Sequence, residues 1–275
     1  MNVGDIFIAL FLQPLINLLV AIYLMLHNLG LPGAFGWAIA LFTLLVRLSV
    51  WPAMHGQLRS AKIIAELKPQ VDALKKKHTD RQSLALAQSQ LYKQHGVNPA
   101  AGCLPALIQL PLFWGLYQAI LHLLPSPSAN LGWVNSLFYF PFLHLDNLPE
   151  PSFFGLNLGV SPGSQGFNLI AIPLFTALLA FAQAKMSLPK PVKVYKTDTP
   201  KEAKEKETME ESLGAIQGQM VFLMPMMMAY FAYQFPLGLA IYLNVYTILG
   251  IIQQHKVSGW GSLEDIIASI KKKLQ

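Results

Sequence analysis

The sequence has few charged residues and almost no cysteine. Only 12% of its 275 residues are charged, against 53% that are hydrophobic, whereas a soluble domain usually has about 25% charged residues. The single cysteine, Cys103, excludes a disulfide framework within the chain, and we expect it to pack as a small apolar residue. The period-two alternation of a membrane β-barrel is also absent, while several apolar runs approach bilayer-spanning length. The composition therefore predicts an all-α integral membrane protein.

Sequence signatures of catalysis are missing as well. The chain has no H-E-x-x-H, G-x-S-x-G or P-loop motif, and its seven histidines are scattered. No acidic residue lies within an expected spanning run, although proton-coupled transporters normally need one. The basic segments carry no recognised nucleic-acid motif, which disfavours direct sequence-specific binding of nucleic acid. We expect no enzymatic activity, no catalytic residue, no metal site and no cofactor.

Arg47 is the exception within the apolar runs, because it lies inside the apolar segment 34–52. An arginine at the centre of a spanning helix costs roughly 2.5–3.5 kcal/mol on insertion scales, so it is a functional hypothesis by default. A helix that ends near residue 51 would, however, leave Arg47 close to its end. The side chain could then extend to the membrane surface and have a structural role only. Position alone leaves both interpretations open.

The other 19 Lys and Arg residues are unevenly distributed. They lie in 53–101, in 185–206 and in the C-terminal tail, whereas 1–46 and 125–166 have none. The positive-inside rule places the basic segments in the cytoplasm and 125–166 outside. Five crossings satisfy this pattern, with the N-terminus outside and the C-terminus in the cytoplasm. The expected segments are an outer-surface amphipathic helix (1–30), spanning helices (31–54, 99–124, 167–187, 215–233 and 234–255), a cytoplasmic helical hairpin (55–98), an extracytoplasmic segment (125–166), a cytoplasmic loop (188–214) and a cytoplasmic tail (256–275).

The N-terminal segment has two interpretations. Asp5, Gln13 and Asn17 fall on one stripe at helical spacing, which favours a weakly amphipathic helix lying on the outer surface. The competing interpretation is a sixth crossing by residues 6–27, which would place Met1 in the cytoplasm. Neither alternative changes the expected topology further along the chain.

The segment 55–98 changes character, with a narrow apolar stripe among many charges. It predicts two antiparallel cytoplasmic helices after Pro52, which we expect to end or kink the first spanning helix. The charged surface is either simply solvated or a docking site for a cytoplasmic partner. The basic candidates for docking are Arg59, Lys62, Lys68, Lys75, Lys76, Lys77 and Arg81.

Two other stretches carry weaker signals. Residues 133–145 are rich in aromatics and are expected at the membrane–water interface. The expected helix 215–233 contains five methionines, which either pack as an adaptable core or form a surface that accepts varied apolar sequences. The pattern does not separate these two roles.

Four motifs resemble the YidC/Oxa/Alb family of membrane protein insertases. They are TLLVRLSVWP (43–52), ELKPQVDALKKKH (66–78), LYKQHGVNPAAGCLPALIQLPLFWGLY (91–117) and FPLGLAIYLNVYTILGIIQQ (235–254). The resemblance covers nearly the whole chain. It implies five transmembrane helices around a hydrophilic groove that is open to the cytoplasm and sideways to lipid. It also implies a compact form in the bacterial plasma membrane.

The resemblance further implies which residues line this groove. Arg47 matches the groove arginine, and Thr43, Gln109, Gln183 and Tyr242 match other groove positions. Leu243 departs from the family, which usually has a second aromatic there. The implied function is insertion and folding of client membrane proteins without nucleotide hydrolysis. Arg47 would attract acidic residues of the client's translocating tail.

The implied partners are client membrane proteins and the lipid bilayer, with the Sec translocon, the signal recognition particle pathway and the ribosome as further candidates. Two rival functions remain at this point. A small transporter or channel would need paired polar residues in several spans, and we find no internal repeat. A translocon-associated scaffold would show no insertion activity without its partner.

Overall fold

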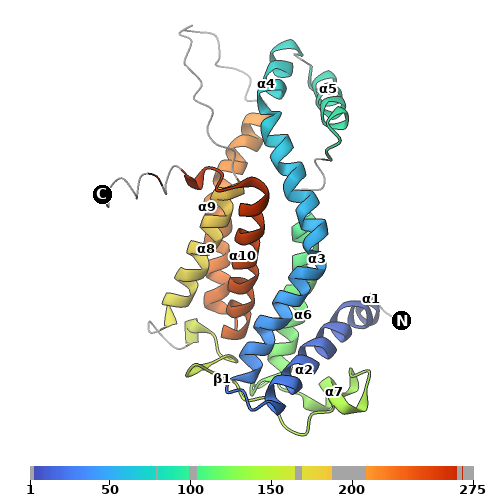
Figure 1. Cartoon of the computed structure of the whole chain (residues 1–275), viewed down its shortest axis with the longest axis vertical. Helices are drawn as coiled ribbons and strands as arrows, with labels where there is room; N and C mark the ends of the chain where they lie inside the picture. The colour runs from blue at the N-terminus through green and yellow to red at the C-terminus, as the bar shows by residue number, and fades with distance from the viewer. Residues whose placement is uncertain are drawn as a thin grey trace.

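The computed structural model describes residues 3–78, 80–98, 104–164, 169–187, 209–264 and 268, and within them the chain is almost entirely helical (Figure 1). The elements are α1 (Val3–Phe7), η1 (Ile8–Leu12), α2 (Gln13–Asn28), α3 (Ala34–Glu66), α4 (Lys68–Lys77), α5 (Arg81–Gln94), α6 (Leu104–Leu123), α7 (Leu131–Ser136), η3 (Pro141–Leu143), β1 (Ser152–Phe153), β2 (Leu156–Asn157), η4 (Pro162–Ser164), α8 (Ala171–Ser187), α9 (Met209–Gln234) and α10 (Leu237–Ser258). The predicted all-α class is confirmed. Cys103, most of the loop 188–214 and the end of the basic tail lie outside the described residues.

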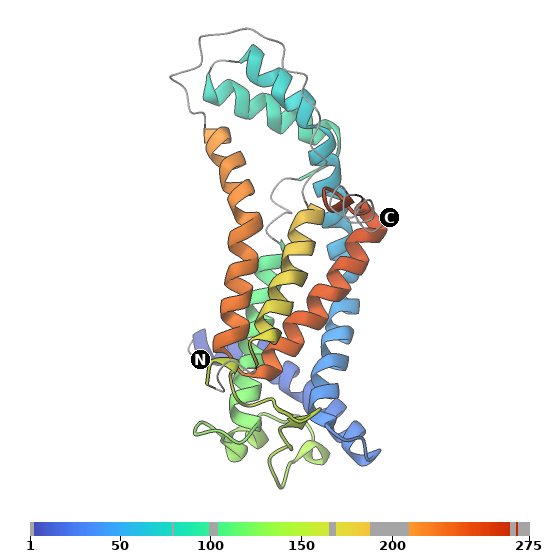
Figure 2. The same ribbon diagram turned by 90° about the vertical axis from the view of Figure 1, so that its left-hand side faces the viewer.

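Five long helices, α3, α6, α8, α9 and α10, run roughly along one axis (Figures 1 and 2). Helix α10 packs against both α3 and α8, and α8 packs against α9. We call the end at which α4 and α5 lie the hairpin end, and the opposite end, where α7 and the short strands lie, the loop end. Within the described residues, three helical stretches are long and apolar enough to cross a membrane: Gly4–Asn28, Ala34–Glu66 and Leu237–Ser258.

Helix α3 does not end at Pro52 but continues to Glu66. The sequence analysis placed the start of the hairpin at residue 55, so Arg59 and Lys62 instead belong to the helix that carries Arg47. A proline removes one backbone donor and restrains the preceding turn, and the residues after Pro52 include enough helix-forming residues to continue. The hairpin proper is α4 and α5, which pack against each other. The Asp80 side chain caps α5 by accepting a 3.0 Å hydrogen bond from the Ser83 backbone N–H.

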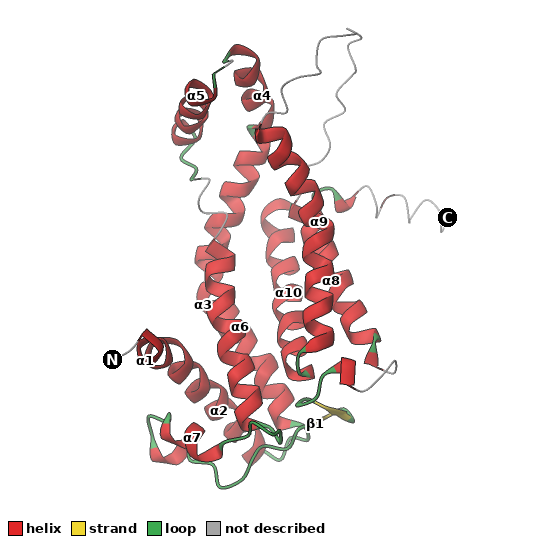
Figure 3. Ribbon diagram, turned by 180° about the vertical axis from the view of Figure 1, so that it is seen from behind, coloured by secondary structure: helices red, strands yellow, loops and turns green. Residues whose placement is uncertain are grey.

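The N-terminal helices lie obliquely to the bundle near its loop end (Figures 1 and 3). One face of α2 packs against α3 and α6, while Leu18 and Met25 on its other side are exposed. Asn17 does not belong to a polar outer stripe, because it is only 6% exposed. Its amide nitrogen donates to the Leu137 carbonyl, and its amide oxygen accepts from the Tyr139 backbone N–H. The oblique course is compatible with a surface helix, which stays a prediction.

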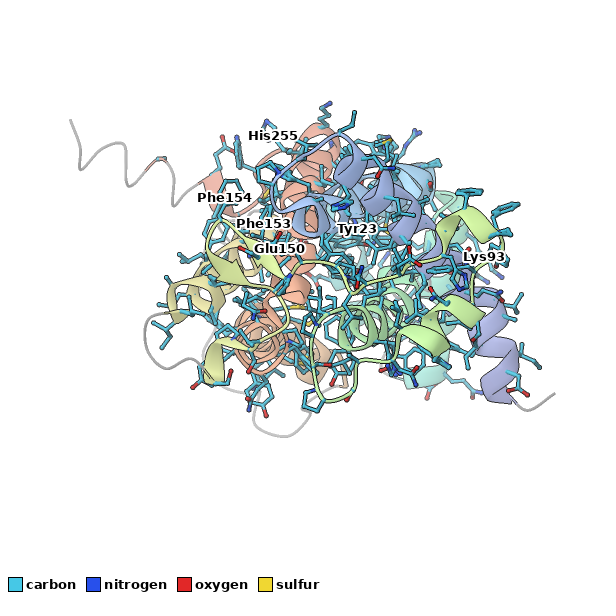
Figure 4. All side chains as sticks on the ribbon, turned by 90° about the horizontal axis from the view of Figure 1, so that it is seen from below. Tyr23, Lys93, Glu150, Phe153, Phe154 and His255 are labelled. Carbon is cyan, nitrogen blue, oxygen red and sulfur yellow. The ribbon has the colours of Figure 1, made fainter. Side chains whose placement is uncertain are left out.

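The segment at the loop end is held against the bundle by backbone contacts. The N–H groups of Leu237 and Gly238, at the start of α10, donate to the carbonyls of Val160 and Leu158. Gly36 lies directly under the Phe153 ring, where a side chain would collide. Seen from this end, Phe153, Phe154 and Glu150 lie together at the surface (Figure 4). The exposed aromatics of this segment are Tyr139, Phe140, Phe142 and Phe154, as an interfacial location requires.

Candidate functional site around Arg47

Arg47 lies inside the helix bundle and does not extend to its surface, because its side chain is only 4% exposed. Helix α3 continues for about five turns beyond it, at 3.6 residues per turn. The guanidinium carbon, Cζ, lies 4.3 Å from the centroid of the Tyr246 ring on α10. Its Nε is fully buried and has no hydrogen-bond partner, and no ion pair joins Arg47 to a carboxylate in the described part of the chain. The structure therefore contains a buried cation without a counter-ion of its own.

Gly250 makes the room that Arg47 occupies. A Cβ atom at this position of α10 would lie 3.0 Å from Arg47 Nη2 and would collide with Gln183 Nε2. The side chains of Arg47 from α3 and Gln183 from α8 therefore both occupy the space next to the Gly250 backbone, where any other residue of α10 would have a side chain. Gln183 is half-buried. The structure brings these two predicted site residues together through a glycine that the sequence analysis did not single out.

Tyr242 and Gln109 form a second contact between helices. The amide nitrogen of Gln109 on α6 donates a 2.9 Å hydrogen bond to the hydroxyl of Tyr242, whose side chain is fully buried on α10. Thr43 lies one turn before Arg47 on α3 and is also fully buried, with its hydroxyl donating to the Ile39 carbonyl of the same helix. Leu243, the residue after Tyr242, packs in the apolar core.

Further polar residues of α10 were missed by the sequence analysis. Gln253 is fully buried, and its amide nitrogen donates a 3.0 Å hydrogen bond to the Trp51 carbonyl of α3. Gln254 donates to Ser187 Oγ at the end of α8. These glutamines continue a face that starts at Tyr242 and passes Tyr246 and Gly250 at spacings of three or four residues. That spacing was the available signal.

Several buried polar atoms where α3, α6, α8 and α10 face one another have no hydrogen-bond partner among the described residues. We define the Arg47 seam as Thr43, Arg47, Gln109, Gln183, Tyr242, Tyr246, Gly250 and Gln253. Four of its side-chain atoms are fully buried and have no hydrogen-bond partner among the described residues: Gln109 Oε1, Arg47 Nε, Tyr246 Oη and Gln253 Oε1. Buried polar groups in proteins are nearly always paired with protein or water. The Arg47 seam therefore has the capacity to bind water or the polar groups of a ligand.

The basic residues predicted to dock a partner lie on the last part of α3 and on α4 and α5, which form the hairpin end (Figure 1). Arg59, Lys62, Lys68 and Lys77 are exposed. Lys75, Lys76 and Arg81 lie within the helical segments, but their side chains are outside the described part of the structure. Exposure is compatible with a solvated face and with a docking surface. No cluster of three or more metal-ligating residues occurs in the described residues.

Comparisons with known proteins agree on one family. The family model described as "60Kd inner membrane protein" matches residues 25–261. Proteins named membrane protein insertase YidC from Rickettsia akari and Rickettsia felis are each 31% identical over 243 residues, covering 86% of this chain and 37% of theirs. A crystal structure of an active YidC insertase with its first transmembrane domain resolved matches with a TM-score of 0.53 and 26% identity, over 87% of this chain and 45% of that one. The chain thus spans less than half the length of these relatives, and it belongs to the YidC/Oxa/Alb family.

Proposed function

We propose that this chain is a membrane protein insertase and chaperone of the bacterial plasma membrane. In this proposal α3, α6, α8, α9 and α10 cross the bilayer, the hairpin end faces the cytoplasm and the loop end faces outside. The 20 residues of α6 and the 22 of α10 span about 30 Å at 1.5 Å per residue, which matches the hydrocarbon core. The distribution of Lys and Arg supports this orientation.

The single observation that carries the proposal is the buried Arg47 without a carboxylate partner. An unpaired charge inside a helix bundle is strongly unfavourable, and such residues mark substrate or ion pathways by default. A passing acidic group would supply the missing counter-ion. The attraction is larger in a site with little water than in bulk solvent, because the effective dielectric constant is lower.

The physical problem that an insertase solves is the polar tail of its client. A tail cannot cross about 30 Å of hydrocarbon with its backbone groups unpaired. In our proposal the Arg47 seam lines a hydrophilic groove that is open to the cytoplasm and sideways to lipid. This groove shortens the hydrophobic distance, and Arg47 attracts acidic residues of the tail. The client's apolar segment then moves into lipid, driven by its own hydrophobic transfer, so no nucleotide is hydrolysed.

A reconstitution experiment tests this function. The purified chain in liposomes is given a single-span client whose N-terminal tail carries two aspartates, and protease protection of the tail measures insertion. We expect Arg47→Ala to lower insertion at least tenfold and Arg47→Lys to preserve most of it, because lysine keeps the charge. Full activity of the alanine variant would exclude the proposed role of Arg47. Flux of small solutes without client insertion would instead indicate a channel or transporter.

A further inference from the structure

Tyr246 is the aromatic residue that covers the guanidinium of Arg47. It lies one helical turn after Tyr242 on α10, and the two tyrosine rings are 5.8 Å apart between centroids. Arg47 Cζ lies 4.3 Å from the centroid of the Tyr246 ring. The Tyr246 hydroxyl is fully buried and has no hydrogen-bond partner among the described residues. The ring of Tyr246 is thus engaged, while its polar atom is free.

Stacking leaves the hydrogen-bonding capacity of arginine intact. The N–H bonds of a guanidinium lie in its plane, so an aromatic ring against its face does not compete with an acceptor at its edge. Such a contact restricts the movement of the group. Arg47 Nε has no hydrogen-bond partner among the described residues, although the side chain is buried. The ring of Tyr246 can therefore hold Arg47 in one orientation and still leave donors available to a ligand.

The stacked arrangement also places a second donor beside the first. A tyrosine hydroxyl can donate one hydrogen bond, and that of Tyr246 is carried by the same ring over which Arg47 Cζ lies, 4.3 Å from the centroid. An ionised carboxylate accepts several hydrogen bonds at once, and bonds to it are roughly twice as strong as those to neutral acceptors. Of the tail groups that a client presents, a carboxylate is the one that matches two adjacent donors, one of which is charged.

We propose that Tyr246 is a specificity-determining residue of the insertion site. Its ring orients the Arg47 guanidinium, and its hydroxyl donates a second hydrogen bond to a carboxylate of the client tail. The pair thereby selects tails with aspartate or glutamate over tails with the corresponding amides. This inference rests on the proposed insertase function, and it adds the Tyr246 hydroxyl as a group that distinguishes a carboxylate from an amide in the client tail.

The test compares two clients that differ only in their tails. One carries two aspartates and the other two asparagines, and each is inserted by the purified full chain in liposomes. The measured quantity is the ratio of the two insertion rates. Variants Tyr246→Phe and Tyr246→Leu are compared with the wild type. Tyr139→Phe is the matched control, because Tyr139 is exposed in the segment at the loop end and lies outside the Arg47 seam.

We expect Tyr246→Phe to keep an aromatic ring against Arg47 but to lower the aspartate-to-asparagine ratio about threefold or more, the value of one lost hydrogen bond. Tyr246→Leu, which removes the ring as well, should lower the ratio further, and Tyr139→Phe should leave it unchanged. An unchanged ratio in both Tyr246 variants would overturn the inference. So would an equal loss for both clients, which would assign Tyr246 a structural role only.

The experiment also separates this inference from the proposed function. Arg47→Ala is included with the same two clients. If it abolishes the preference for aspartate while the Tyr246 variants retain it, Arg47 acts alone and the role of Tyr246 is wrong. If Arg47→Ala leaves both insertion and preference at wild-type values, the proposed function itself fails.

Discussion

The amide nitrogen of Gln109 on α6 donates a 2.9 Å hydrogen bond to the hydroxyl of Tyr242 on α10. The two residues are 133 positions apart in the sequence. Gln109 is half-buried and Tyr242 is fully buried. A polar contact of this kind fixes how the two helices meet, because either side chain left alone would have to find another partner inside the bundle.

We expect Tyr242→Phe to destabilise the protein by about 0.6 kcal/mol, and by no more than about 1.7 kcal/mol, which are the mean and the maximum measured for hydrogen bonds between membrane helices. Thermal unfolding in detergent gives the size of the effect. A double-mutant cycle with Gln109→Leu isolates the pair. If the two mutations remove one shared interaction, the double mutant should lose less stability than the sum of the losses of the two single mutants. Tyr139→Phe is the control, because Tyr139 is exposed in the segment at the loop end. Strictly additive losses would show that the hydrogen bond contributes nothing.

Asn17 ties α2 to the segment that follows α7. Its side chain donates to the Leu137 carbonyl and accepts from the Tyr139 N–H, at 2.9 and 2.8 Å. Asn17→Ala leaves both backbone groups without these partners, which costs about 1–3 kcal/mol where water cannot replace them. We expect a lower unfolding temperature in detergent and faster proteolysis between residues 137 and 145. The neighbouring exposed Leu18→Ala should show neither change, and equal behaviour of the two variants would contradict this role of Asn17.

The fold class and the family could be predicted from the sequence, because apolar runs of spanning length and the motifs around Arg47 are local signals. The structure also brings Arg47 near Gln183, and Gln109 near Tyr242, while their role as one site stays a prediction. The isolation of Arg47 in an apolar run was enough to single it out. Its burial could not be deduced, because that depends on where α3 ends.

Other features depend on partners that are distant in the sequence. The polar stripe that includes Asn17 is visible in the sequence. Its burial is not, because two of its hydrogen-bond partners, Leu137 and Tyr139, are 120 and 122 residues away. Tyr246 shares the helical face of Tyr242, yet nothing in that pattern shows that an arginine of α3 stacks on it. Pro52 carries a local signal to end or kink a helix, and α3 does not end there but continues to Glu66, because the residues after Pro52 include helix formers.

Gly250 should be sensitive even to a methyl group. A Cβ atom there would collide with Gln183 Nε2 and approach Arg47 Nη2 to 3.0 Å, so both side chains must move. We expect Gly250→Ala to reduce insertion of the client with the aspartate tail several-fold more than insertion of the client with the asparagine tail. Gly250→Val should reduce insertion of the aspartate client further. Rates in liposomes measure both effects.

Gly56→Ala is the matched control for this prediction, because Gly56 lies inside α3 with no atom within 4 Å of a Cβ placed there. Alanine at an exposed helical position should stabilise the helix by about 1 kcal/mol and leave insertion unchanged. Wild-type insertion by Gly250→Val would show that the space above Gly250 is not used by the client.

The hairpin formed by α4 and α5 is the element for which the solvated and docking interpretations predict different results. It packs mainly on itself at the hairpin end, and Leu67, Val71 and Leu84 are its buried apolar residues. Replacing residues 68–94 by a flexible Gly/Ser linker should therefore leave the bundle folded and membrane-integrated, since the loop-closure cost of a flexible linker grows only slowly with its length. We expect this deletion to abolish insertion in cells.

A milder variant changes the exposed Lys68 and Lys77 to Gln, which should alter stability by less than about 0.5 kcal/mol. If those charges dock an acidic cytoplasmic partner, insertion in cells should fall several-fold while insertion of the purified protein in liposomes stays constant. Wild-type insertion in cells by the deletion would leave the hairpin as a solvated spacer.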